Sequence, residues 1–228
     1  MTPAPSRPIG AVLFDLDGTL VDTEPAWMAA EARLAEEHGV EWTPADAEAL
    51  VGSDLWDGAR YFIERGVPMG EQEIVDRLVG EVLAWMDDVL PARPGALELL
   101  RALRDEGVPT ALVTMSTRSI VDRVEAALAR SLGGAPFDAT VAGDECERGK
   151  PDPEPYRRGL ELLGVGASDA VAIEDSRTGA ASALAAGLVT IGVPHAVDLQ
   201  GVPGIVHWPS LAGRTPADLA AAIAEARS

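Results

Sequence analysis

Residues 9–19 read IGAVLFDLDGT, and this stretch decides the predicted fold. Residues 9–15 form an apolar run that ends in a carboxylate, which is typical of a strand buried in a parallel sheet. Asp17 lies two positions after Asp15, and Gly18 allows the chain to turn sharply. Ligands of open parallel sheets bind beyond the carboxyl ends of the strands. We therefore expect these polar residues at a binding edge.

After Pro91, strand and helix patterns alternate, which indicates an α/β fold with a doubly wound, Rossmann-like parallel sheet. Further strands are predicted at 109–114, 139–142, 170–174, 188–193 and 205–207, and helices at 95–106, 118–130, 153–163, 178–186 and 216–227. Between the first strand and this region only helical patterns occur, at 25–38, 44–51, 55–65 and 71–89. We predict a core of residues 1–21 and 91–228, with an inserted helical cap of residues 22–90.

Composition narrows the classes of protein to which the chain can belong. The 228 residues are 47% hydrophobic, yet their apolar runs fall well short of the roughly 20 residues of a membrane helix. Cys146 is the single cysteine, which excludes an internal disulfide. The net charge of −19 disfavours nucleic acid and anionic membranes as partners. We expect a cytoplasmic protein, a monomer or a weak homodimer, without a signal peptide.

Polar residues also follow the other predicted strands. Thr114, Met115 and Ser116 come after the strand at 109–114, and Glu174 and Asp175 end the strand at 170–174. Lys150 precedes a predicted helix and is the only lysine of the chain, because the other 17 of the 18 basic residues are arginines. A lone lysine among arginines indicates a place where a compact point charge is required.

These residues suffice for phosphoryl transfer. Asp15 can attack phosphorus and form an acyl phosphate, and Asp17 can give a proton to the leaving oxygen. Nucleophile and phosphate are both anionic, so a hard cation such as Mg²⁺ must bridge them. The predicted magnesium ligands are the carboxylates of Asp15 and Asp175, the backbone carbonyl of Asp17, and Glu174, which binds through water or only orients the ion. Phosphate contacts are predicted for Gly18, Thr114, Met115, Ser116 and Lys150.

The motifs Asp15-Leu16-Asp17-Gly18-Thr19, Thr114, Lys150-Pro151 and Glu174-Asp175 resemble, in order, the four motifs of the haloacid dehalogenase superfamily. The insert and Glu24-Pro25-Ala26-Trp27 are similar to the β-phosphoglucomutase-like and sugar-phosphate phosphatase branch. The resemblance implies a nucleophile at Asp15, an acid/base at Asp17 and a small phosphorylated metabolite as substrate. Met115 departs from the family, which often has Asn there.

Glu24, Trp27 and Trp56 are candidates for lining the substrate pocket from the cap. Residues 22–90 contain 17 Asp plus Glu, four Arg and no Lys, a net charge of −13. Such a cap is poor in the cations that a second phosphate requires, and Trp27 stands where a phosphomutase typically has His. Both features favour a phosphatase over a mutase, although Arg60, Arg65 or Arg77 leave the mutase open. A dehalogenase, which lacks a counterpart of Asp17, and a phosphate-sensing module are weaker alternatives.

Overall fold

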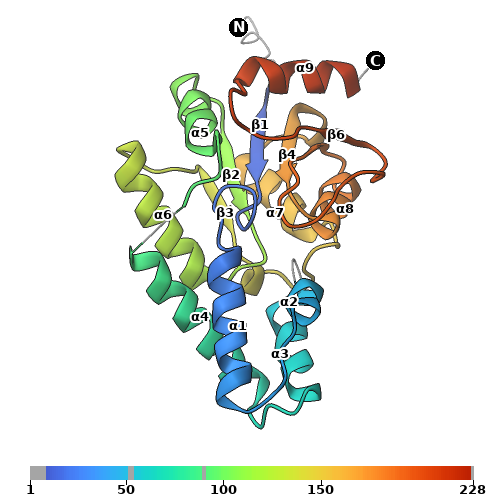
Figure 1. Cartoon of the computed structure of the whole chain (residues 1–228). Coiled ribbons are helices and arrows are strands. Elements are labelled where there is room, and N and C mark those ends of the chain that lie inside the picture. Colours follow the sequence, from blue (N-terminus) through green and yellow to red (C-terminus); the bar gives the residue numbers. More distant parts are fainter. Residues whose placement is uncertain (1–8, 51–53, 89–90, 227–228) are drawn as a thin grey trace, which may run out of the picture.

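The computed structural model describes residues 9–50, 54–88 and 91–226. Its centre is a six-stranded sheet with the order β3-β2-β1-β4-β5-β6, in which all neighbouring strands are parallel (Figure 1). The strands are β1 (Ala11–Phe14), β2 (Thr110–Val113), β3 (Ala139–Val141), β4 (Ala170–Glu174), β5 (Val189–Gly192) and β6 (Ile205–His207). The strand order reverses at β1, so the predicted doubly wound α/β sheet is confirmed.

Both faces of the sheet are covered, because alternate side chains of a strand point to opposite faces. Val12 and Phe14 of β1 belong to one apolar cluster, and Ala11 and Leu13 belong to the other. The first cluster includes residues of α5 (Ala96–Asp105), α6 (Arg118–Leu132) and α9 (Pro216–Ala226), and the second includes residues of α7 (Glu154–Leu163) and α8 (Arg177–Ala185). Burial on both faces explains the continuous apolar run of β1.

The first four helices after β1 lie beyond the carboxyl ends of the strands, on the lower side in Figure 1. They are α1 (Glu24–Glu37), α2 (Pro44–Leu50), α3 (Leu55–Glu64) and α4 (Glu71–Asp88). Helix α4 packs against both α1 and α3, and it also contacts α6 of the core. The helical block is therefore placed over the edge of the sheet where the predicted site residues emerge.

Two connecting segments join this block to the core and pair with each other. The backbone N–H of Asp22 donates to the carbonyl of Pro91 at 2.9 Å, and that of Arg93 donates to the carbonyl of Leu20 at 2.8 Å. Val21 also forms an isolated bridge with Ala92. We propose residues 22–90 as the cap unit, because the chain leaves and rejoins the core at this pairing.

Most differences from the predicted elements lie at their ends. Four of the six strands are shorter than predicted, and α6 continues to Leu132, where Gly133 with φ 71° ends it. Two short 3₁₀ helices, η1 (Gly143–Glu145) and η2 (Ala167–Asp169), were not predicted. Val51, Val89 and Arg227, the last residues of three predicted helices, lie outside the described residues. Among the described helices, none has the length and apolar character needed to cross a membrane.

Candidate active site

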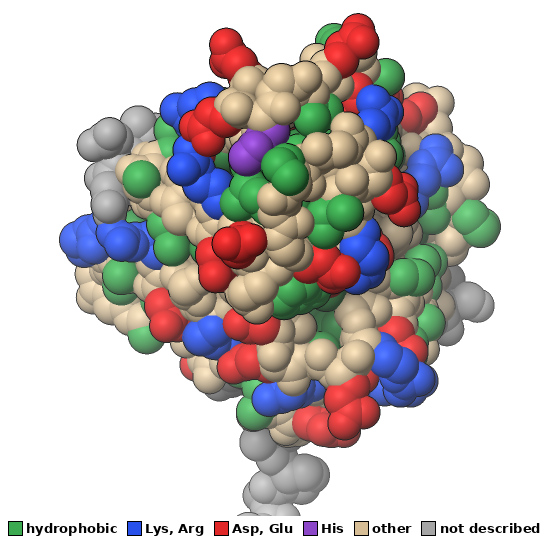
Figure 2. Space-filling model, turned by 90° about the horizontal axis from the view of Figure 1, so that it is seen from below, with side chains coloured by type: hydrophobic (Ala, Val, Ile, Leu, Met, Phe, Trp, Pro, Cys, Tyr) green, Lys and Arg blue, Asp and Glu red, His purple; other side chains and the backbone are tan. Residues whose placement is uncertain are grey.

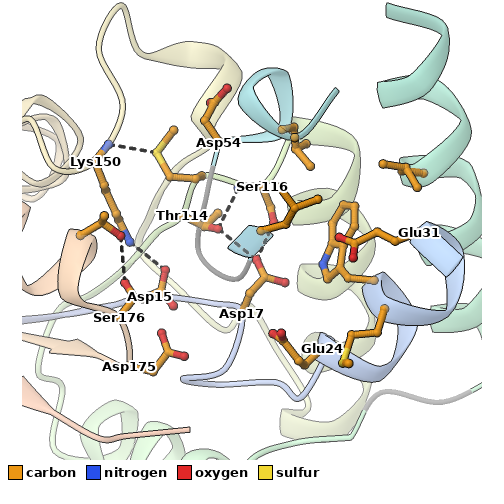
Figure 3. A pocket seen from close by; sticks show the side chains of 18 of the residues that line it. Asp15, Asp17, Glu24, Glu31, Asp54, Thr114, Ser116, Lys150, Asp175 and Ser176 are labelled. Atoms are coloured by element: carbon orange, nitrogen blue, oxygen red, sulfur yellow. Dashed lines mark hydrogen bonds and ion pairs between the residues drawn. The ribbon is translucent and has the colours of Figure 1, made fainter. Parts of the chain in front are cut away.

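Asp15 follows β1 directly and shares a buried ion pair with Lys150. Nζ of Lys150 lies 2.7 Å from Oδ1 of Asp15 (Figure 3). It also donates to the carbonyl of Val113 at 2.9 Å. Only 4% of the Lys150 side chain is exposed. Burial lowers the pKa of Lys150, but the charges of Asp15 and Glu174 outweigh it and raise that pKa above its usual value. Lys150 is therefore a fixed, charged neighbour of Asp15.

Glu174 ends β4 and supports Lys150 from behind. Its Oε1 accepts hydrogen bonds from Nζ of Lys150 at 2.6 Å and from the hydroxyl of Tyr156 at 2.8 Å. Its Oε2 accepts from the hydroxyl of Ser176 at 3.1 Å. The side chain is fully buried and does not line the cavity described below. These contacts fix the orientation of Lys150, and direct or water-mediated metal binding by Glu174 stays a prediction.

The carboxylate of Asp17 is held by hydroxyl groups. Oγ of Ser116 donates to Oδ2 of Asp17 at 2.5 Å, and Oγ1 of Thr114 lies 3.4 Å from the same oxygen. Thr23, at the start of the cap, donates to Oδ1. The backbone N–H of Ser116 in turn donates to Oγ1 of Thr114 at 3.0 Å, which ties the loop after β2 together. Asp17 is thus oriented by both the core and the cap connector.

Gly18 occupies a position that no other residue fits. Its φ is +81°, and an added Cβ would lie 2.1 Å from Oδ2 of Asp175. Both the conformation and the space require glycine. The turn at Gly18 therefore allows the segment after β1 to approach Asp175, which follows β4.

Buried carboxylates outnumber the nearby cations, and this imbalance fits a divalent metal ion. Asp15, Glu174 and Asp175 each offer an oxygen, and these oxygens lie within 4.8 Å of one another. Burial raises the pKa of Asp15 to about 7 and that of Asp175 well above its ordinary value, each with a contribution from neighbouring carboxylates. Hard oxygen donors of this kind suit Mg²⁺, and a bound cation would favour the ionised carboxylates.

A cavity of about 120 Å³ lies between the core and the cap. It is smaller than the roughly 300–1,000 Å³ typical of pockets for drug-sized ligands, which fits a small metabolite. Its described lining residues from the core are Asp15, Asp17, Thr114, Met115, Ser116, Lys150, Asp175, Ser176 and Thr178. Those from the cap are Glu24, Trp27, Met28, Glu31, Ala47, Leu50, Asp54, Leu55, Gly58 and Leu78.

The structure brings most of the predicted site residues together at this cavity. Glu174 and Gly18 stand immediately behind it, and Trp56 does not line it and is 39% exposed. Ser176 lines the cavity and also caps α8, because its hydroxyl accepts from the backbone N–H of Gly179. Sequence reasoning missed Glu31. The signal was present, because Glu31 is seven positions after Glu24 and thus on the same face of α1.

His195 also occupies a more specific place than the general surface or core position expected for it. Its Nε2 lies 2.9 Å from Oδ1 of Asp22, so the segment after β5 contacts the first cap connector. The imidazole also counters the burial that raises the pKa of Glu24. Nothing in the spacing of His195 from the motifs indicated this contact.

The fold and the site together define a class of enzyme: a hydrolase on a doubly wound sheet that gathers aspartates, hydroxyls and one lysine at the strand ends under a helical cap. The model of the haloacid dehalogenase-like hydrolase family matches residues 9–187 of the chain. The chain belongs to this family, as the resemblance of its motifs predicted.

Several relatives of the chain are named as phosphatases. Validoxylamine A 7'-phosphate phosphatase of Streptomyces hygroscopicus subsp. limoneus is 34% identical over 83% of this chain and 88% of its own. Hexitol phosphatase A of Escherichia coli is 33% identical over 86% of this chain and 89% of its own. The crystal structure of CbbY from Rhodobacter sphaeroides in complex with phosphate superimposes with a TM-score of 0.81 at 29% identity, covering 92% of this chain and 99% of that one. The prediction that the chain is a phosphatase is confirmed.

Proposed function

We propose that the protein is a Mg²⁺-dependent phosphatase of small sugar or polyol monophosphates that works through an aspartyl phosphate on Asp15. The observation that carries the proposal is the convergence of Asp15, Asp17, Lys150 and Asp175 on one cavity that the cap closes from the other side. Each of these groups has a role in transferring a phosphoryl group to a carboxylate and then to water.

In the first step an oxygen of Asp15 attacks phosphorus, and the bond from phosphorus to the leaving oxygen breaks. Asp17 gives a proton to that oxygen, so the product leaves as an alcohol. In the second step water attacks the same phosphorus, the bond to Asp15 breaks, and Asp17 takes the proton from water. The products are inorganic phosphate and the regenerated carboxylate of Asp15.

Lys150 and the hydroxyls after β2 provide the fixed environment for these steps. Lys150 offsets negative charge on Asp15 and on the phosphoryl group, while Thr114 and Ser116 orient Asp17. Mg²⁺ would be held by the carboxylates of Asp15 and Asp175 and the carbonyl of Asp17. When bound, it neutralises charge between the nucleophile and the phosphoryl oxygens.

The cap supports hydrolysis rather than a mutase reaction. Lys150 is the only Lys or Arg among the described residues that line the cavity. The cap arginines that could have held a second phosphate are paired with carboxylates: Arg60 with Asp57 and Glu71, Arg65 with Asp46, and Arg77 with Glu37 and Glu81. On the face seen in Figure 2, basic side chains are interspersed with acidic ones. A bisphosphate intermediate would lack a cationic partner in the cap.

The substrate class follows from this lining and from the relatives. Two of them are named as phosphatases of validoxylamine A 7'-phosphate and of a hexitol, and a hexitol phosphate is a polyhydroxylated monophosphate. Trp27, Leu55 and Leu78 offer apolar surface to the carbon skeleton, and the carboxyls of the cap offer hydrogen-bond partners to hydroxyl groups.

The test is phosphate release from a panel of hexose and hexitol monophosphates with Mg²⁺, alongside glucose 1-phosphate with a trace of glucose 1,6-bisphosphate. We expect the monophosphates to be hydrolysed. We expect little glucose 6-phosphate to form from glucose 1-phosphate in the presence of glucose 1,6-bisphosphate. Asp15→Asn is the matched control, since an amide cannot form the acyl phosphate. Faster formation of glucose 6-phosphate than of inorganic phosphate from any substrate would identify a mutase instead. Turnover by Asp15→Asn, with mass spectrometry excluding deamidation, would remove the nucleophile assignment.

A further inference from the structure

Glu31 is a buried carboxyl of the cap that the catalytic steps do not use. It lies on α1, is only 8% exposed, and lines the cavity between cap and core. Within residues 9–50, 54–88 and 91–226, no hydrogen bond or ion pair satisfies its carboxyl group. Figure 3 shows Glu31 extending from α1 toward the same space as Asp17 and Glu24. The remaining accessible surface of this carboxyl faces the place where a substrate would bind.

The two other described carboxyls that line the cavity from the cap have surroundings unlike those of Glu31. Asp54 caps α3, because its Oδ1 accepts from the backbone N–H of Trp56 at 2.8 Å. Glu24 is near His195, which acts against the effect of burial on its pKa. Apolar residues, Leu55 and Leu78 among them, line the same cavity as Glu31. Among the described carboxyls that line the cavity from the cap, Glu31 is the buried one, whereas Glu24 and Asp54 are only half-buried.

A buried carboxyl without a partner is costly in its charged form. Burial, with a further contribution from Glu24, raises the pKa of Glu31 to about 8, so the neutral acid is the main form at pH 7. A neutral carboxyl carries one donor and one acceptor. A hydroxyl group carries the same pair, so the two can satisfy each other in a dry site.

We propose that Glu31 is a specificity residue that hydrogen bonds a hydroxyl of the leaving group, away from the phosphorus atom. This rests on the proposed function, because it presumes a polyhydroxylated monophosphate. The proposal explains why an unpaired carboxyl is kept in an apolar lining where a leucine would be more stable. It also disfavours a second phosphate at this end of the cavity, because Glu24 and Glu31 offer the anion no positive charge.

The experiment compares Glu31→Leu and Glu31→Gln with the wild type, using a hexitol 6-phosphate and p-nitrophenyl phosphate. Leu removes the hydrogen-bonding group, and Gln keeps a donor and an acceptor in the same shape. We expect Glu31→Leu to raise KM for the hexitol phosphate about tenfold, or roughly 1.4 kcal/mol. We expect Glu31→Gln to change this KM by less than about threefold, because the neutral hydrogen bond is retained. KM for p-nitrophenyl phosphate, which lacks the hydroxyls, should stay near the wild-type value in both variants.

Controls separate this role from a structural one. Glu36 is an exposed carboxyl of the same helix, and Glu36→Leu and Glu36→Gln should leave both KM values unchanged. Glu31→Leu should unfold at a temperature at or above that of the wild type, because an unpaired buried carboxyl is removed. An unchanged KM for the hexitol phosphate in Glu31→Leu overturns the proposal. An equal loss in Glu31→Gln also overturns it, since the site would then need a charge and hence a cationic group.

Failure of the proposed function has a different signature. In that case the wild type releases phosphate from p-nitrophenyl phosphate but from no hexose or hexitol monophosphate. Free hexitol then tests Glu31 directly, as an inhibitor of p-nitrophenyl phosphate hydrolysis. Inhibition of the wild type that is weaker in Glu31→Leu and retained in Glu31→Gln supports the hydroxyl site, and the absence of inhibition in the wild type overturns it.

Discussion

The backbone N–H of Lys150 donates a hydrogen bond to the thioether sulfur of Met115, across a distance of 3.3 Å. The Met115 side chain also occupies the space beside Gly149, because a Cβ added to Gly149 would lie 2.3 Å from Cε of Met115. Met115 stands where the family often has Asn, and a phosphate contact was predicted for it. The structure shows a contact of Met115 with the segment that carries Lys150.

Met115 is therefore a positioning residue for Lys150. Met115→Ala should lower kcat by roughly tenfold, since small misplacements of catalytic groups are costly. Met115→Leu keeps most of the volume and should restore kcat to within about threefold, because volume-conserving swaps are well tolerated. Steady-state kinetics with a hexitol phosphate and p-nitrophenyl phosphate check this, since the loss should appear with both substrates. A full kcat in Met115→Ala would mean that the loop needs no support from this side chain.

A second prediction concerns the charge balance of the buried Lys150 cluster. Lys150→Met leaves the carboxylates of Asp15 and Glu174 without their common cation, and breaking a buried pair typically costs about 3–5 kcal/mol. The variant should lose activity and unfold at a lower temperature. Adding Glu174→Gln to it removes one of the unpaired charges, so stability should partly return while activity does not. Thermal unfolding and phosphate release measured on both variants separate the two effects, and a double variant no more stable than Lys150→Met would contradict this account.

The core of the site could be predicted because parallel strands end at one edge of the sheet. Asp15, Thr114 and Asp175 each follow a strand, so their proximity depends only on the alternation of strands and helices. The contact of Tyr156 with Glu174 could not be predicted, because Tyr156 enters the site from a helix whose docking and face are set by tertiary packing. The contact between His195 and Asp22 joins a loop to a connector 173 positions away, and loops carry no periodic signal.

The third prediction concerns Asp175 and the metal. In protein treated with EDTA, Asp175→Asn should be more stable than the wild type, because it removes one of several like charges that are buried together. Mg²⁺ should raise the unfolding temperature of the wild type and have a weaker effect on the variant, since a ligand that binds only the folded state stabilises it. Unfolding scans across a Mg²⁺ titration measure both effects. Equal responses to Mg²⁺ would remove Asp175 from the ligand set, and activity should require higher Mg²⁺ in the variant.

The last prediction concerns Asp17 and the cap. Asp17 accepts hydrogen bonds from Ser116 of the core and from Thr23 of the cap, so we expect its proposed role as the acid to depend on both. Asp17→Asn should slow the first step less for p-nitrophenyl phosphate than for a hexitol phosphate, because a good leaving group needs little protonation.

Thr23→Val serves as the matched variant, because it removes only the hydroxyl that comes from the cap. It should lower kcat for the hexitol phosphate by roughly tenfold, in line with the loss of one orienting contact to a catalytic group, and it should change the rate with p-nitrophenyl phosphate less. Single-turnover measurements isolate the first step. Equal first-step losses with both substrates in Asp17→Asn would mean that Asp17 does not protonate the leaving group. A Thr23→Val enzyme with wild-type rates would mean that Ser116 and Thr114 alone hold Asp17, and that the cap connector has no part in orienting the acid.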